Sequence, residues 1–80
     1  MVIRLLAFGI CRDIIGGSTG TVTVPENCSV SMLLAELKKQ HPRLQELRSL
    51  AVAIDGAYAT DATIISPTSE VALIPPVSGG

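Results

Sequence analysis

Alternating apolar and polar residues predict a strand at the start of the chain. Residues 2–8 form a short run rich in branched side chains, which is typical of a strand. Because successive side chains of a strand point to opposite faces, Ile3, Leu5 and Ala7 share one face. The other face carries a charge and is therefore expected to be less buried; it consists of Val2, Arg4, Leu6 and Phe8.

The same alternation predicts three further strands before the C-terminal region. Residues 21–24 alternate threonine with valine, and we expect the valines to point inward. Residues 50–54 form a third strand. The Asp55-Gly56 pair that follows is typical of the turn that joins two hairpin strands, so we expect a short strand around Tyr58.

Residues 70–74 are expected to form the last strand. Val71 and Leu73 share its inner face, and its outer face consists of Glu70, Ala72 and Ile74. A turn at residues 66–68 precedes the strand. Pro75-Pro76 ends it, because proline cannot donate a hydrogen bond to a ladder.

One segment has the periodicity of a full-length helix. Its apolar stripe follows the i, i+3, i+4, i+7 spacing and consists of Val30, Leu33, Leu34 and Leu37. Ser29 is the expected N-cap, and Pro42 ends the helix because it disfavours helical geometry in the residue before it. Residues 44–47 are spaced for one further turn, and residues 9–15 for a short one that Gly16-Gly17 stops.

This order of elements predicts an α+β fold. A mixed sheet with one main helix packed across it buries the only long apolar stripe, and the β-grasp of ubiquitin-like proteins has this order. In that fold the first and last strands are parallel neighbours. We therefore expect a β-grasp domain at residues 1–74 and a flexible C-terminal Gly-Gly tail at residues 75–80.

Composition excludes several classes of function. The 80 residues carry six basic and seven acidic side chains, a net charge of −1, whereas nucleic-acid binding needs a concentrated basic surface. No apolar run approaches the roughly 20 residues that cross a bilayer. Only two cysteines are present, which favours a reducing, cytoplasmic compartment. We expect no nucleic-acid partner and no membrane.

Catalytic and metal-binding residues are scarce. The glycine-rich segment 16–20 lacks the lysine and the spacing of a phosphate-binding loop. His41 is the only histidine and no CxxC pair is present, so a zinc site has too few ligands. The carboxylates are dispersed along the chain. We therefore expect no bound cofactor and no metal.

The C-terminal sequence is the unusual feature. The chain ends Pro75-Pro76-Val77-Ser78-Gly79-Gly80, and glycines without a Cβ can pass through a narrow channel. The carboxylate of Gly80 is a poor electrophile, but transfer of an adenylyl group from ATP would make it a reactive acyl-adenylate. A sulfur donor could then displace AMP and leave a thiocarboxylate.

At these residues the sequence resembles a known family, the small subunit of molybdopterin synthase. The resemblance covers residues 2–8, 11–16, the main helix, 41–44 and 70–80. Its most specific part is a strand that runs into Ile-Pro-Pro-Val-Ser-Gly-Gly. The chain departs from the family pattern in its Ser-Pro-Thr-Ser turn before the last strand and in its cysteine at position 11.

The resemblance implies a non-catalytic sulfur-donor subunit of an enzyme complex. A ubiquitin-activating-type enzyme would use ATP to adenylate Gly80, which then becomes a thiocarboxylate. The tail (Pro75, Pro76, Val77, Ser78 and Gly79) would insert into the large subunit, which forms a heterotetramer with the carrier. There the sulfur would pass to cyclic pyranopterin monophosphate, two carriers serving each pterin.

Alternation and the resemblance together predict the partner interface. Phe8 and Ile74 lie on outer strand faces that meet near the tail if the first and last strands are parallel. The resemblance supports Phe8, Ile74 and Tyr58 as contacts to the large subunit, and Leu6 and Arg12 complete the expected interface.

Three alternatives remain open at the level of sequence. A sulfur carrier of the thiamine pathway has the same fold and tail chemistry. A ubiquitin-like modifier would be joined to lysines of target proteins. A plain interaction domain would keep its activity without Gly79 and Gly80.

Overall fold

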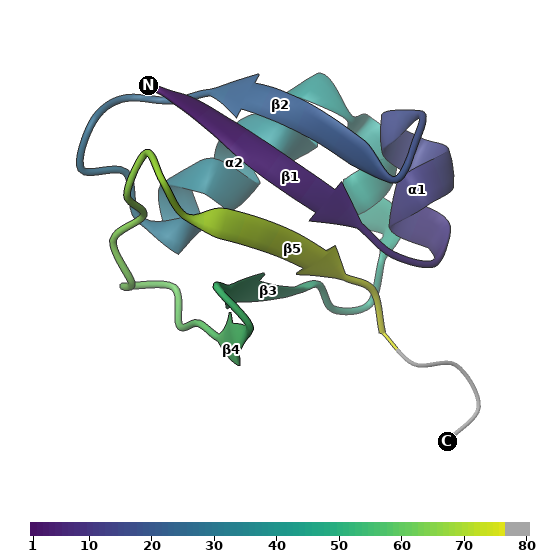
Figure 1. The fold of residues 1–80 in the computed structure, drawn as a ribbon. Coiled ribbons are helices and arrows are strands. Elements are labelled where there is room, and N and C mark those ends of the chain that lie inside the picture. The colour runs from purple at the N-terminus through teal and green to yellow at the C-terminus, as the bar shows by residue number, and fades with distance from the viewer. Residues whose placement is uncertain (77–80) are drawn as a thin grey trace.

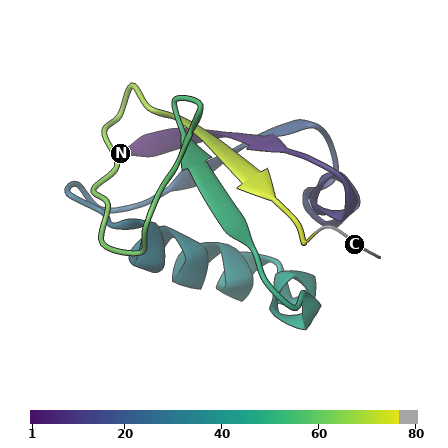
Figure 2. The same ribbon diagram turned by 90° about the horizontal axis from the view of Figure 1, so that it is seen from below.

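The computed structural model describes residues 1–76 and contains one five-stranded sheet with α2 across one face (Figures 1 and 2). The strand order is β2-β1-β5-β3-β4. In chain order the elements are β1 (Val2–Ala7), α1 (Ile10–Ile15), β2 (Thr19–Thr23), α2 (Val30–Gln40), a 3-10 helix (Pro42–Glu46), β3 (Ala51–Ile54), β4 (Ala57–Tyr58) and β5 (Glu70–Ile74).

The central pair of strands is parallel and the outer pairs are antiparallel. β1 pairs with β5 in parallel, Ala7 lying opposite Leu73, while β2, β3 and β4 join in antiparallel register. This mixed sheet is the predicted β-grasp arrangement. Because β1 and β5 run side by side in the same direction, β5 ends beside the point where β1 leads into α1 (Figure 1).

The predicted faces of the first and last strands are confirmed. The inner side chains Ile3, Leu5 and Ala7 are at most 3% exposed, and Val71 and Leu73 are fully buried. They pack on the apolar stripe of α2, of which Leu33 and Leu37 are also fully buried; the rest of the core includes Val22, Val24, Val30, Leu44, Val52 and Ile65. Burial of these side chains is the main term that stabilises the fold.

The main helix begins and ends where the sequence predicts. The Ser29 Oγ accepts a hydrogen bond from the Met32 N–H at 3.2 Å, which satisfies one of the free donors of the first turn. His41 terminates α2 before Pro42, and Pro42 begins the 3-10 helix that carries the buried Leu44.

Several element boundaries differ by one or two residues from the sequence prediction, most clearly in β2 and β1. β2 begins at Thr19 rather than at residue 21, because Thr19 and Gly20 already lie opposite Leu6 and Leu5 of β1. β1 ends at Ala7 rather than at Phe8, since Gly9 adopts a φ of +53° and turns the chain into α1.

The predicted turn at Asp55-Gly56 is confirmed in detail. Both residues have positive φ, 52° and 86°, as the hairpin turn of this type requires. The turn is also tied to the last strand, because the Asp55 Oδ1 accepts a hydrogen bond from the Glu70 N–H at 2.9 Å. The hairpin therefore holds β3 and β5 in register.

Candidate docking surface

The face of the sheet opposite α2 is covered by no helix within residues 1–76, and we call it the open face (Figure 2). Residues opposite each other in neighbouring strands share a face. The registers therefore place one row across four strands on the open face, consisting of Leu6, Ala72, Ala53 and Tyr58.

A second part of this face lies at the end where the tail begins. Ala7 lies opposite Leu73 in the parallel pair. The residues that follow them, Phe8 and Ile74, are therefore neighbours. The Phe8 N–H donates a hydrogen bond to the Leu73 carbonyl oxygen at 3.3 Å, which continues the ladder to this point. Ala51 lies opposite Ile74 on the same face.

These residues form the open-face patch, defined as Leu6, Phe8, Ala51, Ala53, Tyr58, Ala72 and Ile74. Phe8 is 50% exposed and Tyr58 76% exposed, whereas Leu6 and Ile74 are half-buried. The three alanines contribute less exposed surface: Ala51 and Ala72 are half-buried and Ala53 is buried. An apolar surface of this kind is typical of a protein-binding site.

The structure brings four of the five predicted interface residues onto this face. Leu6, Phe8 and Ile74 come from the central strands, and Tyr58 lies at the β4 edge, three strands away from Leu6. Arg12 is exposed but belongs to α1, where it borders a separate depression with Gly9, Asp13 and Gly16. It therefore lies beside the face rather than on it.

A contact at the base of the tail was not predicted from the sequence. A Cβ added to Gly9 would lie 2.9 Å from the Pro75 Cγ, closer than real side chains approach. Gly9 also has a φ of +53°, a region that residues with a Cβ rarely adopt. The Pro75 ring therefore packs against the backbone of Gly9. This contact fixes the position of the chain directly after β5.

The predicted reacting end of the tail lies outside the described residues. Of the residues predicted to insert into a partner, Pro75 and Pro76 are described and are half-buried. Val77, Ser78, Gly79 and Gly80, which include the predicted site of adenylation, are beyond them. The open-face patch therefore adjoins the first residue of the tail, Pro75, through Ile74.

The surroundings of the two thiols are those of cysteines that pack in a protein core. Cys11 and Cys28 are free, and both side chains are fully buried. Burial raises the pKa of each thiol because the thiolate would lose its hydration. Neither cysteine has the lowered pKa of a reactive nucleophile.

Neither a metal site nor a membrane span is found in residues 1–76. No three His, Cys, Asp or Glu side chains of this part lie close enough together to hold a metal ion. None of its helices has the length and apolar character needed to cross a bilayer.

Comparisons with known proteins point to one family. The model of the ThiS family matches residues 5–80. The molybdopterin synthase sulfur carrier subunit of Arabidopsis thaliana is 37% identical over 79 residues, which cover 98% of this chain and 82% of the relative. That of Chlamydomonas reinhardtii is 31% identical over 83 residues and all of both chains.

Solved structures agree on the fold. SAMP1 from Haloferax volcanii superposes with a TM-score of 0.83 at 26% identity, over 100% of both chains. Subunits 1 and 2 of molybdopterin-converting factor from Helicobacter pylori have been solved as a complex; the matching chain has a TM-score of 0.67 at 21% identity, again over 100% of both chains. The chain therefore belongs to the ThiS family, and within it to the molybdopterin synthase sulfur carrier subunits.

Proposed function

We propose that this chain carries sulfur on Gly80 and donates it in molybdopterin synthesis. The observation that carries the proposal is full-length similarity to sulfur carrier subunits, 37% identity in the Arabidopsis relative, in a chain that ends in Gly-Gly. The open-face patch supports it, because an apolar docking surface adjoins the start of the tail.

Sulfur loading in this proposal takes two steps. A carboxylate oxygen of Gly80 attacks the α-phosphorus of ATP, pyrophosphate leaves, and a mixed anhydride with AMP forms. A sulfur nucleophile then attacks the carbonyl carbon and AMP leaves, so that sulfur replaces one oxygen. ATP is bound by the activating enzyme, and the carrier supplies only the carboxylate and the path to it.

The partner that receives the sulfur is the large subunit of molybdopterin synthase. The Helicobacter complex of subunits 1 and 2 supports such a partner, since its matching chain has the same fold over its whole length. We place the contact on the open-face patch, with Phe8 and Ile74 nearest the tail. Docking there would direct Gly79 and Gly80 into the partner, where cyclic pyranopterin monophosphate accepts the sulfur.

The same proposal places the chain in the cytoplasm as the non-catalytic subunit of a heterotetramer. Free thiols at Cys11 and Cys28 are consistent with a reducing compartment.

A second function is favoured by one observation. This chain superposes on SAMP1 of Haloferax volcanii, and a second structure from that organism gives the name in full as small archaeal modifier protein 1. A modifier uses the same adenylate, but its carbonyl carbon is attacked by a lysine amine of a target protein. The product is then an isopeptide instead of a thiocarboxylate.

Mass spectrometry of the loaded chain tests the proposal. The purified chain is incubated with its activating enzyme, ATP and a sulfur source, and the intact mass is measured. We expect the increment for replacement of one oxygen by sulfur, located at Gly80 by fragmentation. A chain with one extra residue after Gly80 is the matched control and should remain unchanged. Isopeptide adducts in place of the thiocarboxylate would support the modifier and contradict the proposal.

A further inference from the structure

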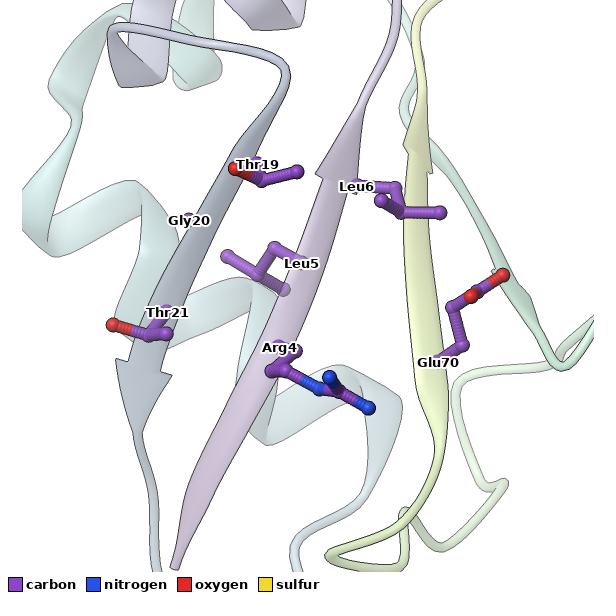
Figure 3. A pocket seen from close by; sticks show the side chains of 7 residues that line it. All are labelled: Arg4, Leu5, Leu6, Thr19, Gly20, Thr21 and Glu70. Carbon is purple, nitrogen blue, oxygen red and sulfur yellow. The ribbon is translucent and has the colours of Figure 1, made fainter.

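A pocket of about 300 Å³ opens on the open face beside the open-face patch (Figure 3). We call it the threonine pocket, and the side chains that matter around it are Arg4, Leu6, Thr19, Thr21 and Glu70. The registers explain its position. Thr19 lies opposite Leu6, and Thr21 lies opposite Arg4, which in turn lies opposite Glu70.

The walls of the pocket present mainly hydrocarbon. In Figure 3 the hydroxyl oxygens of Thr19 and Thr21 lie toward the outer edge of β2, and their carbon atoms lie toward β1. Leu6 adds a branched aliphatic side chain from the neighbouring strand. Gly20, between Thr19 and Thr21, lies opposite Leu5 and therefore belongs to the inner face, so only its backbone borders the pocket.

Two charged side chains, Arg4 and Glu70, border this pocket and point away from each other. Figure 3 shows the guanidinium of Arg4 and the carboxylate of Glu70 pointing in different directions, although the two residues are opposite in register. An incoming apolar side chain would therefore enter beside polar groups that remain in contact with water. This combination of an apolar centre and a polar rim is typical of a protein interface.

The size of the pocket and its neighbours indicate the occupant. A volume of about 300 Å³ is at the lower limit of pockets that hold small molecules, and the pocket is open to solvent on one side. Leu6 belongs both to the pocket and to the open-face patch. A partner that covers the patch would therefore extend over the pocket without a gap.

We propose that the threonine pocket receives one aliphatic side chain of the large subunit and thereby helps this carrier to distinguish its own partner. The proposal rests on the proposed function, because it assigns the partner to the open face. A buried aliphatic anchor in a fitted pocket is a common source of binding energy and specificity at interfaces. The pocket extends the proposed docking surface toward β2.

Blocking the pocket is the test, and β2 itself supplies the control. Thr19→Arg places a long charged side chain where the partner's side chain would enter. Thr23→Arg places the same side chain on the same strand and face but outside the pocket. Both positions are exposed, so both variants should fold; circular dichroism melting curves check this. Affinity for the purified large subunit is measured by calorimetry.

We expect Thr19→Arg to weaken binding by about ten-fold or more, whereas Thr23→Arg changes it by less than about three-fold. Thr19→Val keeps the branched shape and removes only the outward hydroxyl, so its affinity should match that of the unaltered chain. Loading of Gly80 by the activating enzyme should be equal in all three variants.

Several outcomes would overturn the inference. Unchanged affinity in Thr19→Arg would show that the pocket is empty in the complex, while the proposed function would stand. A loss of binding in Thr19→Val as large as in Thr19→Arg would assign the site to hydroxyl recognition instead. A loading defect without a binding defect would assign the pocket to the activating enzyme. Absence of binding by the unaltered chain would contradict the proposed function itself.

Discussion

Truncation of Phe8 separates the proposed docking role of the open face from its role in folding. Phe8 is 50% exposed, so about half of its side-chain surface is already in water in the free domain. Full burial of a phenylalanine contributes roughly 1.5–3 kcal/mol. Phe8→Ala should therefore lower the free energy of unfolding by only about 1 kcal/mol.

The expected loss of binding is larger than this loss of stability. The exposed half of the ring would be buried when the large subunit covers the open-face patch, and truncation of such an anchor costs about 2 kcal/mol or more. A loss of that size raises the Kd by roughly 30-fold. Ile74→Ala should act in the same direction, because Ile74 is the neighbour of Phe8 on this face.

The assay compares the Kd for the large subunit and the Tm of Phe8→Ala and Ile74→Ala with those of a control. Kd for the large subunit is measured by calorimetry, and Tm by circular dichroism. Leu33→Ala is the control, since Leu33 is fully buried in the core and its truncation should cost 2–5 kcal/mol, a figure typical of core leucines. At about 4–8 °C per kcal/mol for a domain of this size, the Tm of Phe8→Ala should fall far less than that of Leu33→Ala.

The opposite pattern would refute this assignment of faces. If Phe8→Ala and Ile74→Ala melted at much lower temperature, and the folded fraction bound the large subunit with unchanged affinity, both side chains would be structural. The open-face patch would then not be the docking surface.

Three further predictions concern Gly9 and the two cysteines. Gly9→Ala should destabilise the domain by roughly 1–3 kcal/mol, because it combines a positive φ with a Cβ 2.9 Å from the Pro75 Cγ. Gly16→Ala has a positive φ but nothing within 4 Å, so denaturant titration should show a smaller loss, and equal losses would contradict the role of the proline contact. Cys11 and Cys28 should resist alkylation in the folded chain; rapid modification under native conditions would argue against the raised pKa that burial gives both thiols. Because the unfolded chain releases these protons first, the free energy of unfolding should decline as the pH rises above about 9, and replacement of both cysteines by alanine should remove part of that decline.

The strands and the main helix could be predicted because local pattern and burial agree in them. The stripe of α2 and the alternation of β1 and β5 each have one buried face, so sequence periodicity reports directly on the core. Asp55-Gly56 was equally informative, because few residue pairs adopt two successive positive φ values. The open-face position of Phe8 and Ile74 followed from the same alternation.

Other features depend on contacts between distant residues and leave no local pattern. Ile65 is 1% exposed, yet it lies in a connection without periodicity; its N–H donates to the Cys28 carbonyl oxygen at 2.9 Å, which fixes the connection to the start of α2. The contact of Gly9 with Pro75 joins residues that only the parallel pairing of β1 and β5 brings together. The threonine pocket depends on the pairing of three strands, β2, β1 and β5.

Transfer of sulfur from Gly80 can be followed directly on the carrier. Thiocarboxylated chain is mixed with the large subunit and cyclic pyranopterin monophosphate, and the intact mass of the carrier is measured over time. The account predicts that the carrier returns to its carboxylate mass as molybdopterin appears, with two carriers consumed for each pterin. A thiocarboxylate that persists in the presence of both, or is lost without formation of a dithiolene, would contradict it.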